Sequence, residues 1–169
     1  MPESSIIIRA ADPSEFDIAS EFWVSMRREL NMPDEDLAAN WKTRSVDYFR
    51  RRYDAGELRW FLAYDGDTVV ASAAGFLTDG YPSEICVNRR VGYVAGVFVK
   101  PRWRRRGLAR TVTQAAVDWL WEIGCRIVRL HAANEARAIY EKMGFEPSNE
   151  MIIERPALRS RDLLPHRGA

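Results

Sequence analysis

The feature that most constrains the fold is an apolar segment, Val94–Val99, followed closely by a strongly periodic one. A continuous apolar run of this kind, ended by Pro101, is typical of a strand buried on both faces of a sheet. Beyond it, apolar residues recur every three or four positions and predict an amphipathic helix over 107–124: Leu108, Val112, Ala115, Trp119 and Ile123. A buried strand that leads directly into a helix indicates an α/β fold.

The alternation of strand-like and helix-like segments extends over most of the chain. Strand-like segments lie between turn residues and occupy 4–10, 60–64, 68–77, 89–99, 126–131 and 151–154. Helix-like segments, with an apolar stripe or a capping residue, run from Phe16 to Leu30, from Leu37 to Arg52, over 107–124 and from Asn134, the expected N-cap, to Met143. The short connections between them favour right-handed crossovers within a single sheet.

The composition is that of a globular chain. Its 169 residues favour one domain, expected to span residues 1–155, with a polar C-terminal tail at 156–169. With 25 basic and 24 acidic residues the net charge is +1, so a global positive field for nucleic acid is absent. Cys86 and Cys125 cannot form a disulfide framework, and no metal site is expected. We see no signal peptide or membrane-spanning run and expect a cytoplasmic location.

The turn between Val99 and Leu108 carries the strongest chemical signal. The first turn of a helix has unpaired N–H groups and the positive end of the helix dipole, which favour a bound anion. Gly107 lacks a Cβ and Ala109 is small, so a ligand can approach this backbone. Neighbouring arginines would attract a di- or triphosphate. The residues alone leave three interpretations open: an anion site, a solvated basic loop, or a nucleic-acid contact in which Trp103 stacks on a base.

Two motifs resemble those of a known family. Arg104-x-x-Gly107-x-Ala109 resembles the [RQ]-x-x-G-x-[GA] motif of the GNAT superfamily of acetyl-CoA-dependent N-acetyltransferases. Downstream, the segment from Tyr140 to Phe145 is similar to the second motif of that family, which usually ends Y-x-x-x-G-F. The order of elements also matches over residues 5–155. The resemblance implies a mixed central sheet of about six to seven strands flanked by about four helices.

The resemblance also implies roles for individual residues. The pantetheine arm of acetyl-CoA would lie along the Val97–Val99 backbone, with the Val97 amide as oxyanion donor. The pyrophosphate would lie on backbone N–H groups between Arg105 and Arg110. Tyr140 matches the general acid that protonates the departing thiolate. Many members place an asparagine seven residues before this tyrosine, whereas Asn134 precedes it by six. The implied cofactor site consists of Val97, Phe98, Val99, Arg104, Arg105, Arg106, Gly107, Leu108, Ala109, Arg110 and Asn134.

A base must take a proton from the acceptor amine, which is mostly protonated at neutral pH. The stretch Tyr93–Val99 contains no acidic residue, so Glu29 and Glu84 are the candidates. The acceptor is expected between the first two helices and the Thr78–Asn88 loop. Aromatic residues from these segments form either a pocket or part of the core: Trp23, Trp41, Tyr48 and Tyr81.

The resemblance therefore predicts an N-acetyltransferase that moves an acetyl group from acetyl-CoA to a primary amine by direct transfer in a ternary complex. The expected partners are acetyl-CoA and an amine acceptor, without metal, nucleic acid or membrane, and a homodimer is left open. Another acyl-CoA or an alcohol acceptor is a lower-ranked variant. The alternative from a different class is a non-catalytic protein on the same scaffold that binds coenzyme A or nucleic acid.

Overall fold

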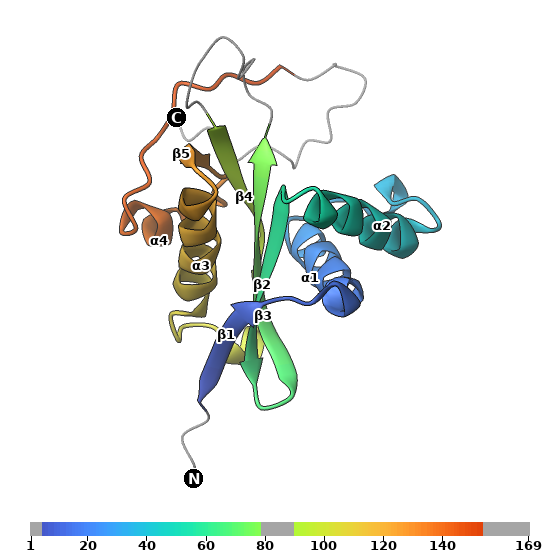
Figure 1. Ribbon diagram of the computed structural model, residues 1–169. Coiled ribbons are helices and arrows are strands. Elements are labelled where there is room, and N and C mark those ends of the chain that lie inside the picture. The colour runs from blue at the N-terminus through green and yellow to red at the C-terminus, as the bar shows by residue number, and fades with distance from the viewer. Residues whose placement is uncertain (1–4, 79–89, 154–169) are drawn as a thin grey trace.

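The computed structural model describes residues 5–78 and 90–153, which form one sheet with helices on both faces (Figure 1). The strand order follows the chain order. The first four strands are antiparallel to their neighbours, and the fourth and fifth are parallel. The strands are β1 (Ile6–Ala10), β2 (Leu58–Asp65), β3 (Thr68–Thr78), β4 (Arg90–Val99) and β5 (Cys125–Arg129).

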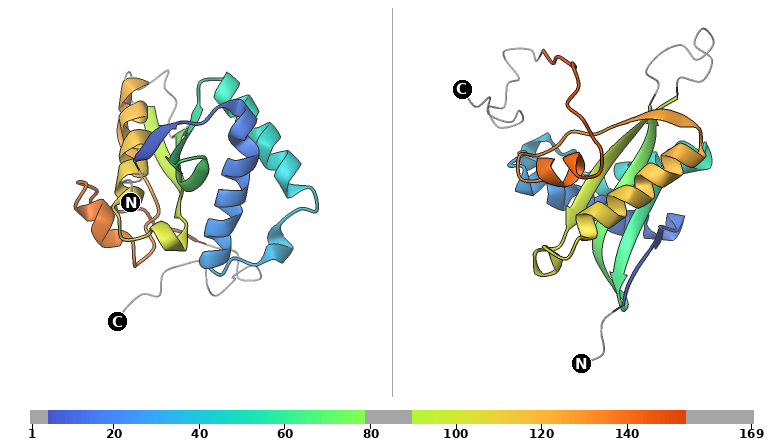
Figure 2. Two further views of the ribbon diagram at one scale, coloured as in Figure 1. Left: turned by 90° about the horizontal axis from the view of Figure 1, so that it is seen from below. Right: turned by 90° about the vertical axis from the view of Figure 1, so that its left-hand side faces the viewer.

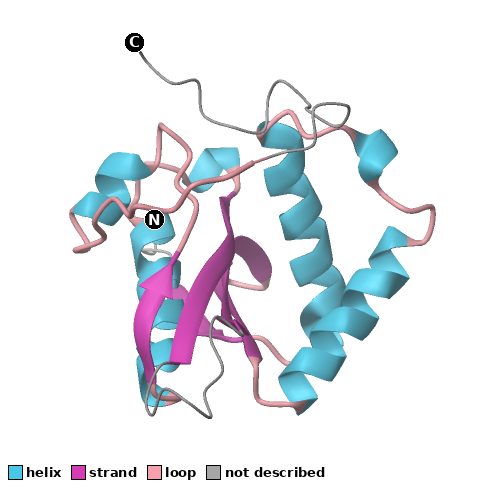
Figure 3. Cartoon of the chain, turned by 90° about the horizontal axis from the view of Figure 1, so that it is seen from above, coloured by secondary structure: helices cyan, strands magenta, loops and turns pink. Residues whose placement is uncertain are grey.

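Helices pack on opposite faces of this sheet (Figures 2 and 3). One face is covered by α1 (Phe16–Glu29) and α2 (Trp41–Asp54), and the other by α3 (Leu108–Glu122), with α4 (Arg137–Glu141) beside α3. Short 3-10 turns occupy Pro13–Glu15, Asp34–Asp36 and Pro101–Trp103. No helix in the described residues is both long enough and apolar enough to span a membrane.

The central strands contribute to two hydrophobic cores. On the α1/α2 face, the fully buried Trp60 packs with Phe16 and Phe49. On the α3 face, Val70 and Val112 belong to a second cluster and are also fully buried. Because side chains of a strand alternate between faces, a sheet covered on both sides needs apolar residues at successive positions. The apolar run in β4 is explained in this way, as the sequence predicted.

The α/β class and the four α-helices are confirmed, but the described sheet has five strands instead of the expected six to seven. The strand expected at 151–154 does not form over residues 151–153, because these residues pair with no other strand, and Met151 and Ile153 are almost fully exposed. The expected helix from Asn134 is also too long: α4 begins at Arg137, and Asn134 lies in a preceding turn without a side-chain capping bond. The predicted tail at 156–169 lies outside the described residues.

Candidate active site

A bulge in β4 is held open by one glycine. Ala95 pairs with Ala74 and Phe98 with Ser72, so Gly96 and Val97 together face a single residue of β3. Gly96 has a φ of +62°, and a Cβ at this position would collide with the Trp60 indole. The Ser72 hydroxyl donates a 2.8 Å hydrogen bond to the Gly96 carbonyl. Buried contacts with Trp60 and Ser72 therefore fix this bulge.

Just before this bulge, β4 separates from β5, its second partner strand. The strand pairs with β5 only over Arg90–Tyr93, and β5 ends at Arg129 while β4 continues to Val99. Within the described residues, the β5-facing backbone of 94–99 has no strand beside it. Unpaired backbone along a strand edge can accept an extended ligand through strand-like hydrogen bonds. The carboxyl half of β4 therefore offers a slot for a linear chain bearing amide groups.

The same strand leads into a helix N-terminus with free donors. Arg105 and Gly107 adopt left-handed conformations, with φ of 63° and 79°, and α3 begins at the next residue. In the described part of the chain, the backbone N–H groups of 105–110 donate to no acceptor. A Cβ built at Gly107 would meet no atom within 4 Å, so the space above this turn is open. Converging amides at a helix N-terminus bind phosphate.

The arginines around the turn differ in their contacts. Arg104 donates from Nε to the Val99 carbonyl at 2.9 Å and forms an ion pair with Glu29 at the end of α1. It therefore anchors the turn to β4 and α1. Arg105, Arg106 and Arg110 are exposed and form no ion pair with a described residue, so their charges remain available to a polyanion.

Tyr140 lies on α4, which packs beside α3. The residue is 7% exposed, and its ring contacts Phe145 edge to face with centroids 5.9 Å apart. Its hydroxyl has no hydrogen-bond partner in the described residues. Burial raises the pKa of Tyr140 above its ordinary value of 10, so at neutral pH the phenol is protonated and able to donate.

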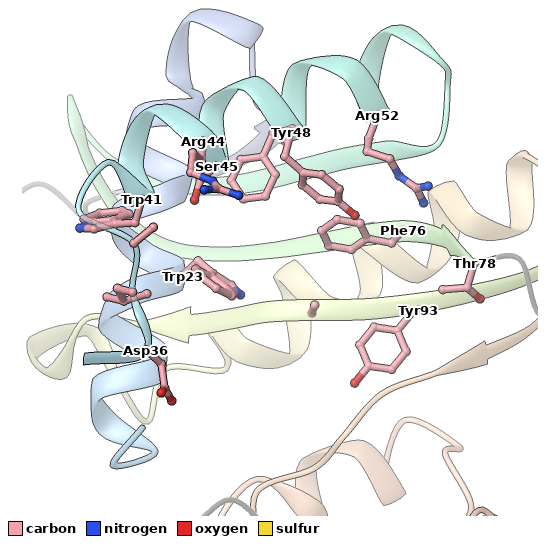
Figure 4. Close-up of a pocket in the computed structure, with 14 residues that line it drawn as sticks. Trp23, Asp36, Trp41, Arg44, Ser45, Tyr48, Arg52, Phe76, Thr78 and Tyr93 are labelled. Carbon is pink, nitrogen blue, oxygen red and sulfur yellow. The ribbon is translucent and has the colours of Figure 1, made fainter. Parts of the chain in front are cut away.

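A cavity of about 620 Å³ opens on the other face of the sheet (Figure 4). It lies between α1, α2, the Asp34–Asp36 turn and the strands β3 and β4. Six of its 14 lining residues are aromatic, namely Trp23, Trp41, Tyr48, Phe49, Phe76 and Tyr93, and Ala95 lines it from β4. Trp23, Trp41 and Tyr48 were predicted as pocket or core residues, and they line the pocket. Tyr81 lies outside the described residues.

Charged groups lie along this cavity as well. Arg52 pairs with Glu57 at 2.9 Å and also donates to the Leu77 carbonyl. Asp36 and Arg44 form no ion pair within the described residues. The described lining thus carries two arginines and one carboxylate, of which one arginine is already neutralised.

Sequence reasoning missed one contact at the cavity. Tyr93 forms a hydrogen bond through its hydroxyl with His131 Nδ1, in the segment after β5, and burial raises the pKa of Tyr93. One indication in the sequence could have placed Tyr93 at the cavity: side chains alternate along a strand, so Tyr93 lies on the same face as Ala95.

The remaining candidates are not among the described residues that line this cavity. Glu29 is held by Arg104 and is not a described lining residue. Asn134 is exposed in the turn before α4 and makes no side-chain hydrogen bond with a described residue. Glu84 lies outside the described residues. The structure therefore brings together the β4 slot, the α3 N-terminus and the aromatic cavity around the Gly96 bulge.

An opened parallel strand pair beside a helix N-terminus with free amides gives this α/β fold the features of a site for an extended anionic ligand. The acetyltransferase (GNAT) family model matches residues 20–145. The chain belongs to this family.

Curated relatives match most of the length of the chain. The aminoglycoside N(6')-acetyltransferase type 1 of Stenotrophomonas maltophilia is 30% identical over 165 residues, covering 88% of this chain and 99% of the relative. The enzyme of the same name from Salmonella enteritidis is 24% identical over 140 residues, covering 80% of this chain and 90% of the relative.

Solved structures share the fold. A Clostridium acetobutylicum protein described as a predicted acetyltransferase, crystallised with acetyl-CoA, superposes with a TM-score of 0.79 at 18% identity, covering 92% of this chain and 99% of the other. The aminoglycoside N-acetyltransferase AAC(6')-Iy in complex with CoA gives a TM-score of 0.69 at 22% identity, covering 92% and 97%. The protein is an N-acetyltransferase, and the predicted family, fold class and acetyl transfer to an amine are confirmed.

Proposed function

We propose that this acetyltransferase holds acetyl-CoA along the open half of β4 and across the start of α3, and that it receives an amine acceptor in the aromatic cavity. The observation that carries this proposal is that the β4 edge at 94–99, which has no described strand beside it, leads within a few residues to the N–H groups of 105–110, which donate to no described acceptor. The proposal assigns residues 1–155 to one catalytic domain, followed by a tail at 156–169.

The phosphate end is assigned to the α3 turn. The N–H groups of 105–110 donate to no described acceptor, the Cβ position of Gly107 is open, and the start of α3 is the positive end of its dipole. Arg105, Arg106 and Arg110 add charge that no described acidic residue neutralises. Arg104 acts as a positioning residue because both of its contacts join the turn to its neighbours.

The reacting end is assigned to the bulge. Acetyl-CoA supplies the activated acetyl group. The Val97 N–H stabilises negative charge that develops on the acyl oxygen, in the manner of an oxyanion hole. Tyr140, protonated because its pKa is raised, donates its proton to the departing sulfur. Phe98 and Leu108 are buried and contribute main-chain position rather than side-chain contact.

The acceptor amine attacks the acetyl carbonyl carbon directly, so the acetyl group passes from sulfur to nitrogen and coenzyme A leaves as the thiolate, without an acyl-enzyme. A carboxylate that takes the amine proton through water remains part of the proposal, with Glu29 and Glu84 as its candidates. The names of the curated relatives give aminoglycosides as one acceptor class to test.

Calorimetric titration with acetyl-CoA tests the assignment, with ATP and NAD as controls. We expect selective binding in the micromolar range. Gly107→Glu should weaken acetyl-CoA binding at least tenfold, because it places bulk and negative charge where phosphate is bound. Gly56→Glu is the matched control: Gly56 also has a positive φ, 71°, and open space around its Cβ position, but lies after α2. Equal affinity of both variants would show that the phosphate site lies elsewhere.

A further inference from the structure

The walls of the aromatic cavity carry information about the acceptor itself. We propose that the preferred acceptor is a monoamine on a flat aromatic body, an arylalkylamine, rather than a polycation such as an aminoglycoside. This inference rests on the proposed function, since it takes the cavity as the acceptor site.

Aromatic side chains reach the cavity from both helices and from the sheet (Figure 4). Trp23 lies on α1, Trp41 and Tyr48 on α2, and Phe76 on β3. Tyr48 is 42% exposed, so much of its ring stays in water in the absence of a ligand. Flat apolar ligands bind such walls by stacking and by removing apolar surface from water. An aromatic acceptor would gain from both effects.

The charge of the lining opposes a polycation. Asp36 is the single carboxylate among the described lining residues. Arg44 forms no ion pair with a described residue, so its positive charge acts on any ligand in the cavity. The guanidinium of Arg27 lies 5.2 Å from the Trp23 ring centroid and adds a further positive charge beside that ring. One carboxylate can neutralise one ammonium group, whereas several ammonium groups would remain unpaired beside arginine.

The part of the cavity lined by β4 indicates where the amine would react. Ala95 lines the cavity and directly precedes Gly96 in the bulge. Its methyl group leaves room that a larger side chain would fill. Tyr93 forms the neighbouring wall, with its hydroxyl already engaged by His131. A ring between the helix aromatics and a short arm toward Ala95 would bring the nitrogen to the proposed acetyl position at Val97.

Three acceptors distinguish size, shape and charge in a thiol-release assay at saturating acetyl-CoA. 2-Phenylethylamine carries one amine on a ring, hexylamine one amine on a flexible apolar chain, and kanamycin several amines on a polar body. We expect kcat/KM for 2-phenylethylamine to exceed that for each of the other two at least tenfold. Kanamycin turnover equal to or better than that of 2-phenylethylamine would overturn the inference. The inference would also be overturned if 2-phenylethylamine neither reacted nor changed the tryptophan fluorescence.

Variants of α2 separate the aromatic and charge effects. Trp41→Ala should lower kcat/KM for 2-phenylethylamine at least fivefold and leave kanamycin unchanged. Arg44→Glu should raise kcat/KM for kanamycin at least fivefold. Arg51→Glu is the matched control, because Arg51 is exposed on the same helix but does not line the cavity. No response of kanamycin to Arg44→Glu would contradict the charge argument. Acetyl-CoA affinity, measured in parallel, reports on the proposed function separately from the acceptor preference.

Discussion

Tyr140 packs its ring against Phe145 while its hydroxyl bonds to no described residue. Replacing it with phenylalanine keeps the packing and removes only the hydroxyl. Because a positioned general acid contributes about 10²–10⁴-fold to a rate, Tyr140→Phe should lower kcat by about 10²-fold or more. Acetyl-CoA affinity should stay within twofold of the wild-type value, as calorimetry can show.

Tyr53→Phe provides the comparison for this variant, since Tyr53 also packs edge to face, against Phe16, on the opposite face of the sheet. Its kcat should not change. If both variants lose activity equally, Tyr140 has a structural role only. Because burial raises the Tyr140 pKa above 10, the acid form persists through neutral and mildly alkaline pH, and this group should cause loss of activity only above pH 10.

Single residues were predictable where their neighbours in sequence determine their role. Gly107 follows an arginine-rich turn and precedes a periodic helix, so its function as a helix start is local. Tyr93 and His131 are 38 positions apart, and no local pattern joins them. The charge of the cavity was equally hidden, because Arg44 and Asp36 lie on different elements and only the packed fold brings them to one wall.

At the scale of elements, the bulge in β4 depends on the contact between Gly96 and Trp60. Gly96→Ala forces a side chain into a left-handed conformation and against a fully buried indole. We expect a loss of about 2–5 kcal/mol in the free energy of unfolding, the sum of backbone strain and overpacking. Chemical denaturation measures this loss.

Gly66→Ala isolates the backbone part of that cost. Gly66 has a φ of +57°, and a Cβ there meets no atom within 4 Å. This variant should lose only about 1–2 kcal/mol. A similar loss in both variants would mean that the Trp60 ring moves aside without cost and that the bulge is not held by the core.

Elements followed from the sequence where one buried face determines their extent. The helix predicted over 107–124 is α3 (Leu108–Glu122), because its stripe packs on a fully covered sheet. The hairpin around Gly66 is likewise β2 and β3. The strand expected at 151–154 failed over 151–153 because strand formation also needs a partner, and apolar residues alone do not supply one. The separation of β4 from β5 is another property of pairing that no segment encodes by itself.

At the scale of the whole molecule, one carboxylate joins the N-terminal strand to the rest of the fold. Glu15 accepts hydrogen bonds from the Arg9 guanidinium at 2.8 Å, from the Asp12 N–H at 2.8 Å and from the Tyr64 hydroxyl. These donors lower the pKa of Glu15 to about 2, with the Arg9 bond as the largest cause. A group with a lowered pKa stabilises the fold above its ordinary value of 4.5 and loses that effect as the pH falls toward 2.

Glu15→Gln should therefore reduce the free energy of unfolding by about 1–3 kcal/mol at pH 7. The difference from wild type should shrink between pH 4.5 and about 2, because protonation removes the same charge from the wild-type side chain. Denaturation curves across this range test the expectation. A difference that does not change with pH would mean that the ionised carboxylate contributes nothing beyond its shape.

The proposed acetyl-CoA site and the proposed acceptor site rest on different elements, and this difference affects how such enzymes diverge. The proposed donor site is supported by buried residues of β4 and α3, such as Val94, Val99 and Val112, so few substitutions at these positions leave the fold intact. The proposed acceptor walls include Trp41, Arg44 and Tyr48, which are partly or largely exposed on α2. Substitutions at such positions cost little stability. Natural selection can therefore retune what is acetylated while the acetylating chemistry stays fixed, and inheritance of the fold need not bring inheritance of the substrate.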